Sequence, residues 1–248
     1  MWEGGTINMN ILILSDIHGN LNAFRAVKTA VRNYIIDGCV LLGDVIDYGM
    51  HSNEVIEEMQ QLPYKILCNI RGNHEEAVIS DIYDRFSSER GRECAKYTRG
   101  KLNENSWQFI NNMCSVGKYE FNMDGKLCLA VHGSLKDNLW KSISINDDLS
   151  GYEKYDYVFS GHSHLPHFFE RYYQCDNPSK RNKKKTIFLN PGSVGQPRNH
   201  NSMAQYAILD TTTEEIEFKK VAYDIENEQL AYYGQVDEFY KTRLKEGI

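Results

Sequence analysis

The chain has 248 residues, enough for one large α/β domain or two small ones, and we expect a single domain over residues 1–248. Lys and Arg number 28 and Asp and Glu number 34, so the formal net charge is -6, with 41% hydrophobic and 25% charged residues. This is the composition of an ordinary globular protein, and it excludes a disordered chain, collagen and a coiled coil.

The longest strongly apolar runs, residues 11–14 and 40–42, are far shorter than the roughly 18 residues of a membrane helix, so we expect no membrane segment. The first ten residues, MWEGGTINMN, contain an acidic residue and no basic one, which is not the pattern of a signal peptide. The six cysteines are scattered without a Cys-x-x-Cys pair, so we predict reduced thiols and a cytoplasmic protein. The acidic balance also argues against nucleic acid as a partner.

In the first third of the chain, short apolar runs alternate with segments of helical period. Residues 11–14 predict a buried strand, and residues 21–34 a helix with its apolar side chains on one face. A strand at 39–42, a helix at 53–62 and a strand at 65–70 follow. Strands that alternate with helices predict a largely parallel sheet with both faces covered.

Five later apolar runs have less helix between them. They are residues 127–131, 157–160, 168–173, 186–189 and 204–209. This half of the chain therefore predicts a mixed or antiparallel sheet.

Three further segments have a pattern that indicates structure but not a single function. Residues 75–116 have helical character, and we interpret them as a lid, as an oligomer face, or as helices that complete the cover of the sheet. The basic run at 180–185, KRNKKK, predicts a solvated hairpin tip, with a phosphate-binding patch as the alternative. The tail after residue 223 predicts a helix packed on the rim, to which we assign no role. The apolar anchors expected in the 75–116 segment are Ile82, Tyr83, Phe86, Trp107, Ile110 and Met113.

Polar side chains follow five of the predicted strands at the point where each strand ends. Because open α/β sheets bind ligands beyond the carboxyl ends of their strands, we expect these side chains to converge. In chain order they are Asp16 and His18, then Asp44, then Asn73 and His74, then His132, and finally His162 and His164.

These residue types supply carboxylate, amide and imidazole ligands without thiolate, which suits Mn, Fe, Zn, Co or Ni. In an extended segment, residues two apart point the same way, so Asp16 with His18, and His162 with His164, would each deliver two ligands to one volume. Seven candidate ligands, the set above without His74, are too many for one such ion. We therefore predict two divalent ions that share Asp44 as a bridging carboxylate.

The motifs of the calcineurin-like metallophosphoesterases resemble, in order, Asp16-x-His18, Gly43-Asp44, Gly72-Asn73-His74-Glu75, His132 and Gly161-His162-x-His164 of this sequence. The resemblance extends from residue 11 to about residue 210, with no departure at a ligand position. Residues 190–198, NPGSVGQPR, resemble the small prokaryotic branch that contains phosphodiesterases and dinucleoside polyphosphate hydrolases. The resemblance implies a four-layer α/β/β/α sandwich with a dinuclear metal centre at one edge.

When the family's roles are transferred to the matching residues, the resemblance implies that the ligands are divided between two ions. It also implies that His74 binds neither ion and instead donates to the leaving oxygen. Asn20 is implied to orient the ligands or bind substrate, or else to cap the helix that begins at residue 21. Arg198 is implied to hold a phosphate oxygen, or else is a surface charge. One ion would take Asp16, His18, Asp44 and His164, and the other Asp44, Asn73, His132 and His162.

The implied activity is hydrolysis of phosphoester or phosphoanhydride bonds, with the attacking hydroxide supplied by the metal pair. The expected substrate is a small phosphorylated compound, and the preferred interpretation is a nucleotide such as a dinucleoside polyphosphate. The alternatives are a general phosphodiesterase, a protein Ser/Thr phosphatase and, last, a non-catalytic scaffold like the retromer subunit of the superfamily. A homo-oligomer is compatible with the sequence.

Overall fold

The computed structural model describes residues 9–176 and 184–248, so residues 1–8 of the first segment and most of the basic run at 180–185 lie outside it. Among the described residues, no helix has the length and apolar character needed to cross a membrane. The helices are α1 (Leu21–Ala30), α2 (Ser52–Gln60), α3 (Asn73–Ser80), α4 (Glu89–Lys101), α5 (Glu104–Asn111), α6 (Ile225–Gln229) and α7 (Phe239–Glu246), with a 3-10 turn η1 (Val31–Asn33).

The first sheet has a parallel centre, as predicted, with antiparallel strands added at one side. In the described chain it has six strands, and β1 to β4 run parallel to one another while β10 and β11 run antiparallel to β1 and to each other. In spatial order the strands are β11 (Ile216–Val221), β10 (Ala204–Asp210), β1 (Asn10–Leu14), β2 (Gly38–Leu41), β3 (Lys65–Arg71) and β4 (Ser115–Val116).

The second sheet is mixed, which confirms the prediction for the later half of the chain. Five strands of the described chain form it, with β6, β7 and β9 parallel and an antiparallel strand at each edge. In spatial order the strands are β5 (Lys118–Met123), β6 (Lys126–Val131), β7 (Tyr157–Ser160), β9 (Lys185–Asn190) and β8 (His167–Tyr172).

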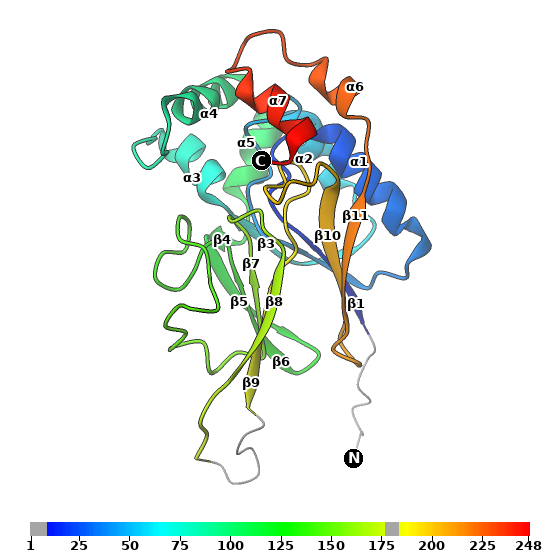
Figure 1. Cartoon of the computed structure of the whole chain (residues 1–248), viewed down its shortest axis with the longest axis vertical. Helices are drawn as coiled ribbons and strands as arrows, with labels where there is room; N and C mark the ends of the chain where they lie inside the picture. The colour runs from blue at the N-terminus through cyan, green and yellow to red at the C-terminus, as the bar shows by residue number, and fades with distance from the viewer. Residues whose placement is uncertain (1–8, 177–183) are drawn as a thin grey trace.

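The two faces of the first sheet pack against different layers. Leu12 and Leu14 of β1 belong to the core shared with helix residues such as Phe24, whereas Ile11 and Ile13 belong to the core between the two sheets. The helices lie on one side of the first sheet, as Figure 1 shows. Both faces of the first sheet are therefore covered, as the β-α alternation predicted, by helices on one face and by the second sheet on the other.

The outer face of the second sheet is covered by the connection between β6 and β7, residues 132–156, in which no described residue is helical. Ile143, Leu149 and Tyr152 of this connection are buried against Leu129 and Phe188 of the sheet. Two stacked sheets with outer cover confirm the predicted sandwich, and in this chain the outermost layer is irregular.

Residues 75–116 fold as α3, α4 and α5, as Figure 1 shows, and most of the predicted anchors are buried. Ile82 was wrongly predicted to be an anchor, because its side chain is 61% exposed. Phe86 belongs to the connection between α3 and α4, and its ring contacts that of His74. The C-terminal helix α7 packs against α4 and the loop after β2, because Tyr240 shares a buried cluster with Cys94 and stacks on Tyr48. The proposed role of the segment as a lid or an oligomer face stays a prediction.

Candidate metal centre

Five of the seven candidate ligands lie just beyond strand ends in a left-handed backbone conformation, which few non-glycine residues adopt. Asp16, His18, Asp44, His162 and His164 have φ angles of 53, 49, 52, 63 and 57°. The prediction of extended backbone at Asp16–His18 and His162–His164 was therefore wrong. Left-handed conformations of non-glycine residues persist only where surrounding structure holds them, and they concentrate at functional sites.

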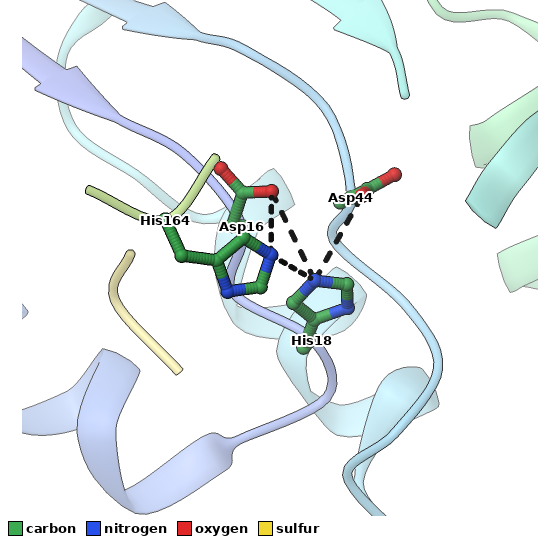
Figure 2. Close-up of side chains that lie close together, drawn as sticks. All are labelled: Asp16, His18, Asp44 and His164. Carbon is green, nitrogen blue, oxygen red and sulfur yellow. Dashed lines mark hydrogen bonds and ion pairs between the residues drawn. The ribbon is translucent and has the colours of Figure 1, made fainter. Parts of the chain in front are cut away.

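The first group of ligands brings together side chains from three strand ends. Asp16, His18, Asp44 and His164 are all buried, and one ligand atom from each lies within 4.8 Å of the others. His18 Nε2 and His164 Nε2 are 3.2 Å apart, and His164 Nε2 is 3.2 Å from Asp16 Oδ1. Figure 2 shows these atoms pointing toward one another.

The tautomers of these two histidines leave their Nε2 atoms facing each other. His18 Nδ1 donates to the carbonyl of Ile46 at 3.1 Å, and His164 Nδ1 donates to the carbonyl of Gln196 at 2.5 Å. Each Nε2 therefore presents a lone pair. Burial lowers the pKa of His18, and burial with the nearby Arg198 lowers the pKa of His164 to about 4, which favours the neutral ligand form.

A cation fits this arrangement better than protein groups alone do. Two imidazole lone pairs and a carboxylate oxygen point at one buried volume, and among the described residues Asp16 Oδ1 has no hydrogen-bond partner. Hydrogen-bond acceptors that face one another in a protein interior with no donor between them cost folding free energy. Each histidine also donates its other N–H to a carbonyl, the usual support of a metal-ligating imidazole.

The second group of ligands surrounds Asn73 and includes Asp44 again. His132 Nε2 lies 3.1 Å from Asp44 Oδ2 and 3.0 Å from Asn73 Oδ1, and His162 Nδ1 lies 2.9 Å from the same Asn73 oxygen. His132 Nδ1 donates to the carbonyl of Leu42 at 2.7 Å. Burial opposes the protonation of His132, but Asp44 raises its pKa to about 9, so a cation bound here would displace a proton.

Asp44 is the residue that the two groups share. Burial alone would raise its pKa, but His132 and His74 outweigh burial and hold the pKa well below its usual range. The two groups divide the seven candidate ligands as the family resemblance implied, with Asn73 close to the second group. His162 and His164 therefore lie in different groups, against the expectation that each close pair serves one volume.

Two glycines allow the backbone to approach the ligands closely. A Cβ atom on Gly72 would lie 2.1 Å from Asp44 Oδ1, and one on Gly161 would lie 2.3 Å from Ser15 Oγ and 3.1 Å from Asp16 Oδ2. No side chain fits at these distances.

Glu75 supports the ligands without being one. Its carboxylate is completely buried and accepts hydrogen bonds from the backbone N–H groups of Asp44, Val45, Ile46 and Gly72 at 2.7–3.2 Å. The loop that carries Asp44 is thereby tied to the start of α3. Glu75 is the last residue of the Gly-Asn-His-Glu motif, but no role was predicted for it from the sequence.

His74 stays outside both groups and is held by Asp47, a residue that the sequence analysis missed. His74 Nδ1 lies 2.7 Å from Asp47 Oδ2, and the other oxygen of Asp47 accepts from Thr98 Oγ1 at 2.9 Å. His74 Nε2 is 3.8 Å from Asp44 Oδ2. Burial alone would lower the pKa of His74, but Asp44 and Asp47 outweigh it and raise the pKa. No sequence spacing marks Asp47, because Thr98 and His74 reach it only in the folded chain.

A cavity of about 390 Å³ opens beside the two groups. Asp44, Asn73, His74 and Arg198 line it, so Arg198 lies at the site as implied. The connection between α3 and α4 and the one between β6 and β7 add a further wall. Of its residues, the sequence had marked only Phe86, as an apolar anchor. The wall consists of Arg85, Phe86, Ser87 and Trp140.

Asn20 lies apart from this cavity. Its Oδ1 accepts from the N–H of Ala23 at 3.0 Å and caps α1, and its Nδ2 donates to the carbonyl of Gly195 and to Tyr223 Oη. The helix-cap alternative is therefore observed. Asn20 is not among the described residues that line the cavity, and it fastens α1 to the 190–198 loop.

The sequence profile of the calcineurin-like phosphoesterase superfamily domain matches residues 9–214 of the chain. The chain belongs to this superfamily, and it is a phosphoesterase hydrolase.

Individual relatives match over nearly the whole chain. The uncharacterized protein MJ0912 of Methanocaldococcus jannaschii is 29% identical over 244 residues, covering 96% of this chain and 95% of the relative. The crystal structure of a metallophosphoesterase from Sphaerobacter thermophilus has a TM-score of 0.74 and 26% identity, covering 98% of this chain and 100% of that one. The hypothetical protein PH1004 of Pyrococcus horikoshii OT3 has a TM-score of 0.77 at 18% identity, covering 97% and 99%, and shows the same fold.

Proposed function

We propose that the two groups of ligands bind two divalent transition-metal ions, of the Mn, Fe, Zn, Ni or Co class, and that the protein hydrolyses a phosphoester or phosphoanhydride bond between them and His74. The observation that carries the proposal is the position of Asp44, whose carboxylate belongs to both groups. A shared carboxylate is what holds two cations close together.

Such an ion pair, when bound, supplies the attacking hydroxide near neutral pH and neutralises phosphate oxygens. The chain supplies the remaining functions. His74, held at Nδ1 by Asp47, would give a proton or hydrogen bond from Nε2 to the departing oxygen. Arg198 is at the cavity wall, where its guanidinium would hold a phosphate oxygen.

The preferred substrate in this proposal is a nucleotide, such as a dinucleoside polyphosphate. Two arginines and three aromatic rings line the same cavity: Arg85, Arg198, Tyr48, Phe86 and Trp140. Arginine suits a chain of phosphates, and an aromatic ring suits one of the two bases of a dinucleoside polyphosphate. The 390 Å³ cavity is of a size that holds a small molecule, which ranks a phosphopeptide lower.

The test begins with protein freed of metal and then reconstituted with manganese or another ion of the class. We expect turnover of bis-p-nitrophenyl phosphate that chelation abolishes and manganese restores. Asp44→Ala should lose bound metal and catalytic rate together. Glu54→Ala is the control, because it also removes a carboxylate, but from an exposed position on α2 that does not line the cavity, and it should retain both. Full activity of the metal-free protein would refute the proposal.

A substrate panel then separates the alternatives. Dinucleoside tetraphosphates, cyclic nucleotides, simple diesters and phosphopeptides are compared at equal concentration. The proposal expects the largest kcat/KM for a dinucleoside polyphosphate or another nucleotide. A phosphopeptide as the best substrate would favour the protein phosphatase interpretation, and a metal-loaded protein without any turnover would favour the scaffold.

A further inference from the structure

A second, larger cavity lies next to the one that holds the candidate ligands. Its volume is about 660 Å³, within the range of small-molecule pockets. His162 and Arg198 line both cavities, so the second one adjoins the candidate metal centre. We call it the apolar chamber, because most of its remaining lining is hydrophobic.

The apolar walls of the chamber come from two segments. Ile143 and Ile145 belong to the connection that covers the second sheet, whereas Leu165 and Phe168 lie between the candidate ligand His164 and the first residues of β8. Ile145, Leu165 and Phe168 are 61%, 44% and 48% exposed. One exposed apolar side chain is ordinary, but three that meet around one hollow beside a polar centre indicate a binding surface.

Stacked aromatic rings form part of the lining of the apolar chamber. Phe169 stacks on Phe188 with ring centroids 4.7 Å apart, and His167 stacks on Phe169 at 5.6 Å. His167 Nε2 is buried inside the protein and does not face the open chamber. Burial lowers the pKa of His167 to about 4, so its ring is neutral and adds an uncharged surface to the chamber.

We propose that the apolar chamber binds the base of a nucleotide whose phosphate lies between His162 and Arg198. The proposal rests on the proposed function, since it places one part of the same substrate. A base is planar and apolar on its faces, so it matches an apolar chamber that has an exposed Phe168 ring and Arg198 in its lining. A simple alkyl substituent has no ring to stack on Phe168.

The test compares two diesters that release the same p-nitrophenol. One is the p-nitrophenyl ester of thymidine 5′-phosphate, and the other is methyl p-nitrophenyl phosphate. In Phe168→Ala we expect KM for the nucleoside ester to rise about tenfold with kcat little changed, because a base loses its stacking partner. KM for the methyl ester should stay as in the unmodified protein.

Three further variants sharpen the result. Tyr172→Ala removes an aromatic ring of similar exposure, 55%, from the same strand but outside the apolar chamber, and it should change neither KM. Phe168→Tyr keeps a ring and should retain the low KM for the nucleoside ester. Ile145→Ser changes the wall formed by residues 142–145, and it should raise KM for the nucleoside ester but not for the methyl ester.

The outcomes separate this inference from the proposed function. If the metal-loaded protein hydrolyses neither ester, the proposed function fails. If it hydrolyses both, and Phe168→Ala raises the two KM values equally or raises neither, the base site is refuted while the metal centre stands. A circular dichroism spectrum and melting temperature like those of the unmodified protein establish that Phe168→Ala is folded.

Discussion

Replacing Glu75 by Gln should destabilise the protein, because the carboxylate serves four backbone N–H groups at once. Oε2 accepts from Asp44 and Gly72, both at 2.8 Å, and Oε1 accepts from Val45 and Ile46 at 2.7 and 3.2 Å. A glutamine keeps one acceptor oxygen, and its amide nitrogen must face two N–H donors. Each buried donor left without an acceptor costs about 1–3 kcal/mol, so we expect a loss of about 2–6 kcal/mol in the free energy of unfolding.

The assay is urea unfolding of the metal-free protein, followed by circular dichroism, with titration of manganese on the folded variant. Metal affinity should fall as well, because the bonds to Oε2 position the backbone of Asp44 and that of Gly72, the residue before Asn73. Glu76→Gln is the matched control. Glu76 is the next residue, its side chain is 34% exposed, and among the described residues its carboxylate forms only a long ion pair with Arg71, at 3.6 Å. A loss below about 1 kcal/mol in Glu75→Gln, or an equal loss in the control, would contradict this reasoning.

Three further results are expected. His74→Gln should retain bound metal and slow turnover about 10² to 10⁴-fold, measured as kcat beside metal content; loss of metal would show that His74 is a ligand. Asp47→Asn should retain metal and lower kcat at least about 10²-fold, because His74 Nδ1 loses its carboxylate partner at 2.7 Å; a kcat like that of the unmodified protein would exclude a positioning role for Asp47. The hydrogen bond to buried Glu228, at 2.9 Å, raises the pKa of His51 even though burial opposes it. The folded pKa then exceeds the unfolded one, so this stabilisation is complete below about pH 6.5 and is lost as pH rises through the folded pKa. His51→Gln should remove that part of the pH dependence of unfolding, and identical pH profiles would refute it.

The central strands and the candidate ligands could be predicted because both depend on local pattern. Apolar runs such as residues 11–14 identify strands that are buried on both faces, and parallel strands end at one edge of a sheet, so the residues after them converge. The edge strands β5 and β11 were not predicted. Their sequences, KYEFNM and IEFKKV, mix charged and apolar residues because much of their surface is exposed.

The side chains available as ligands could be read from the sequence, since their order after the strands and their family resemblance are properties of the chain. The direction in which Asp16 and His18 point depends on the folded chain. Their left-handed backbone is held by hydrogen bonds to the carbonyl groups of residues 43–45. The fold also brings Thr98 to Asp47 across 51 positions and gathers Ile145, Leu165 and Phe168 around one chamber. Contacts between segments that are distant in sequence leave no trace in local periodicity, so they could not be predicted from it.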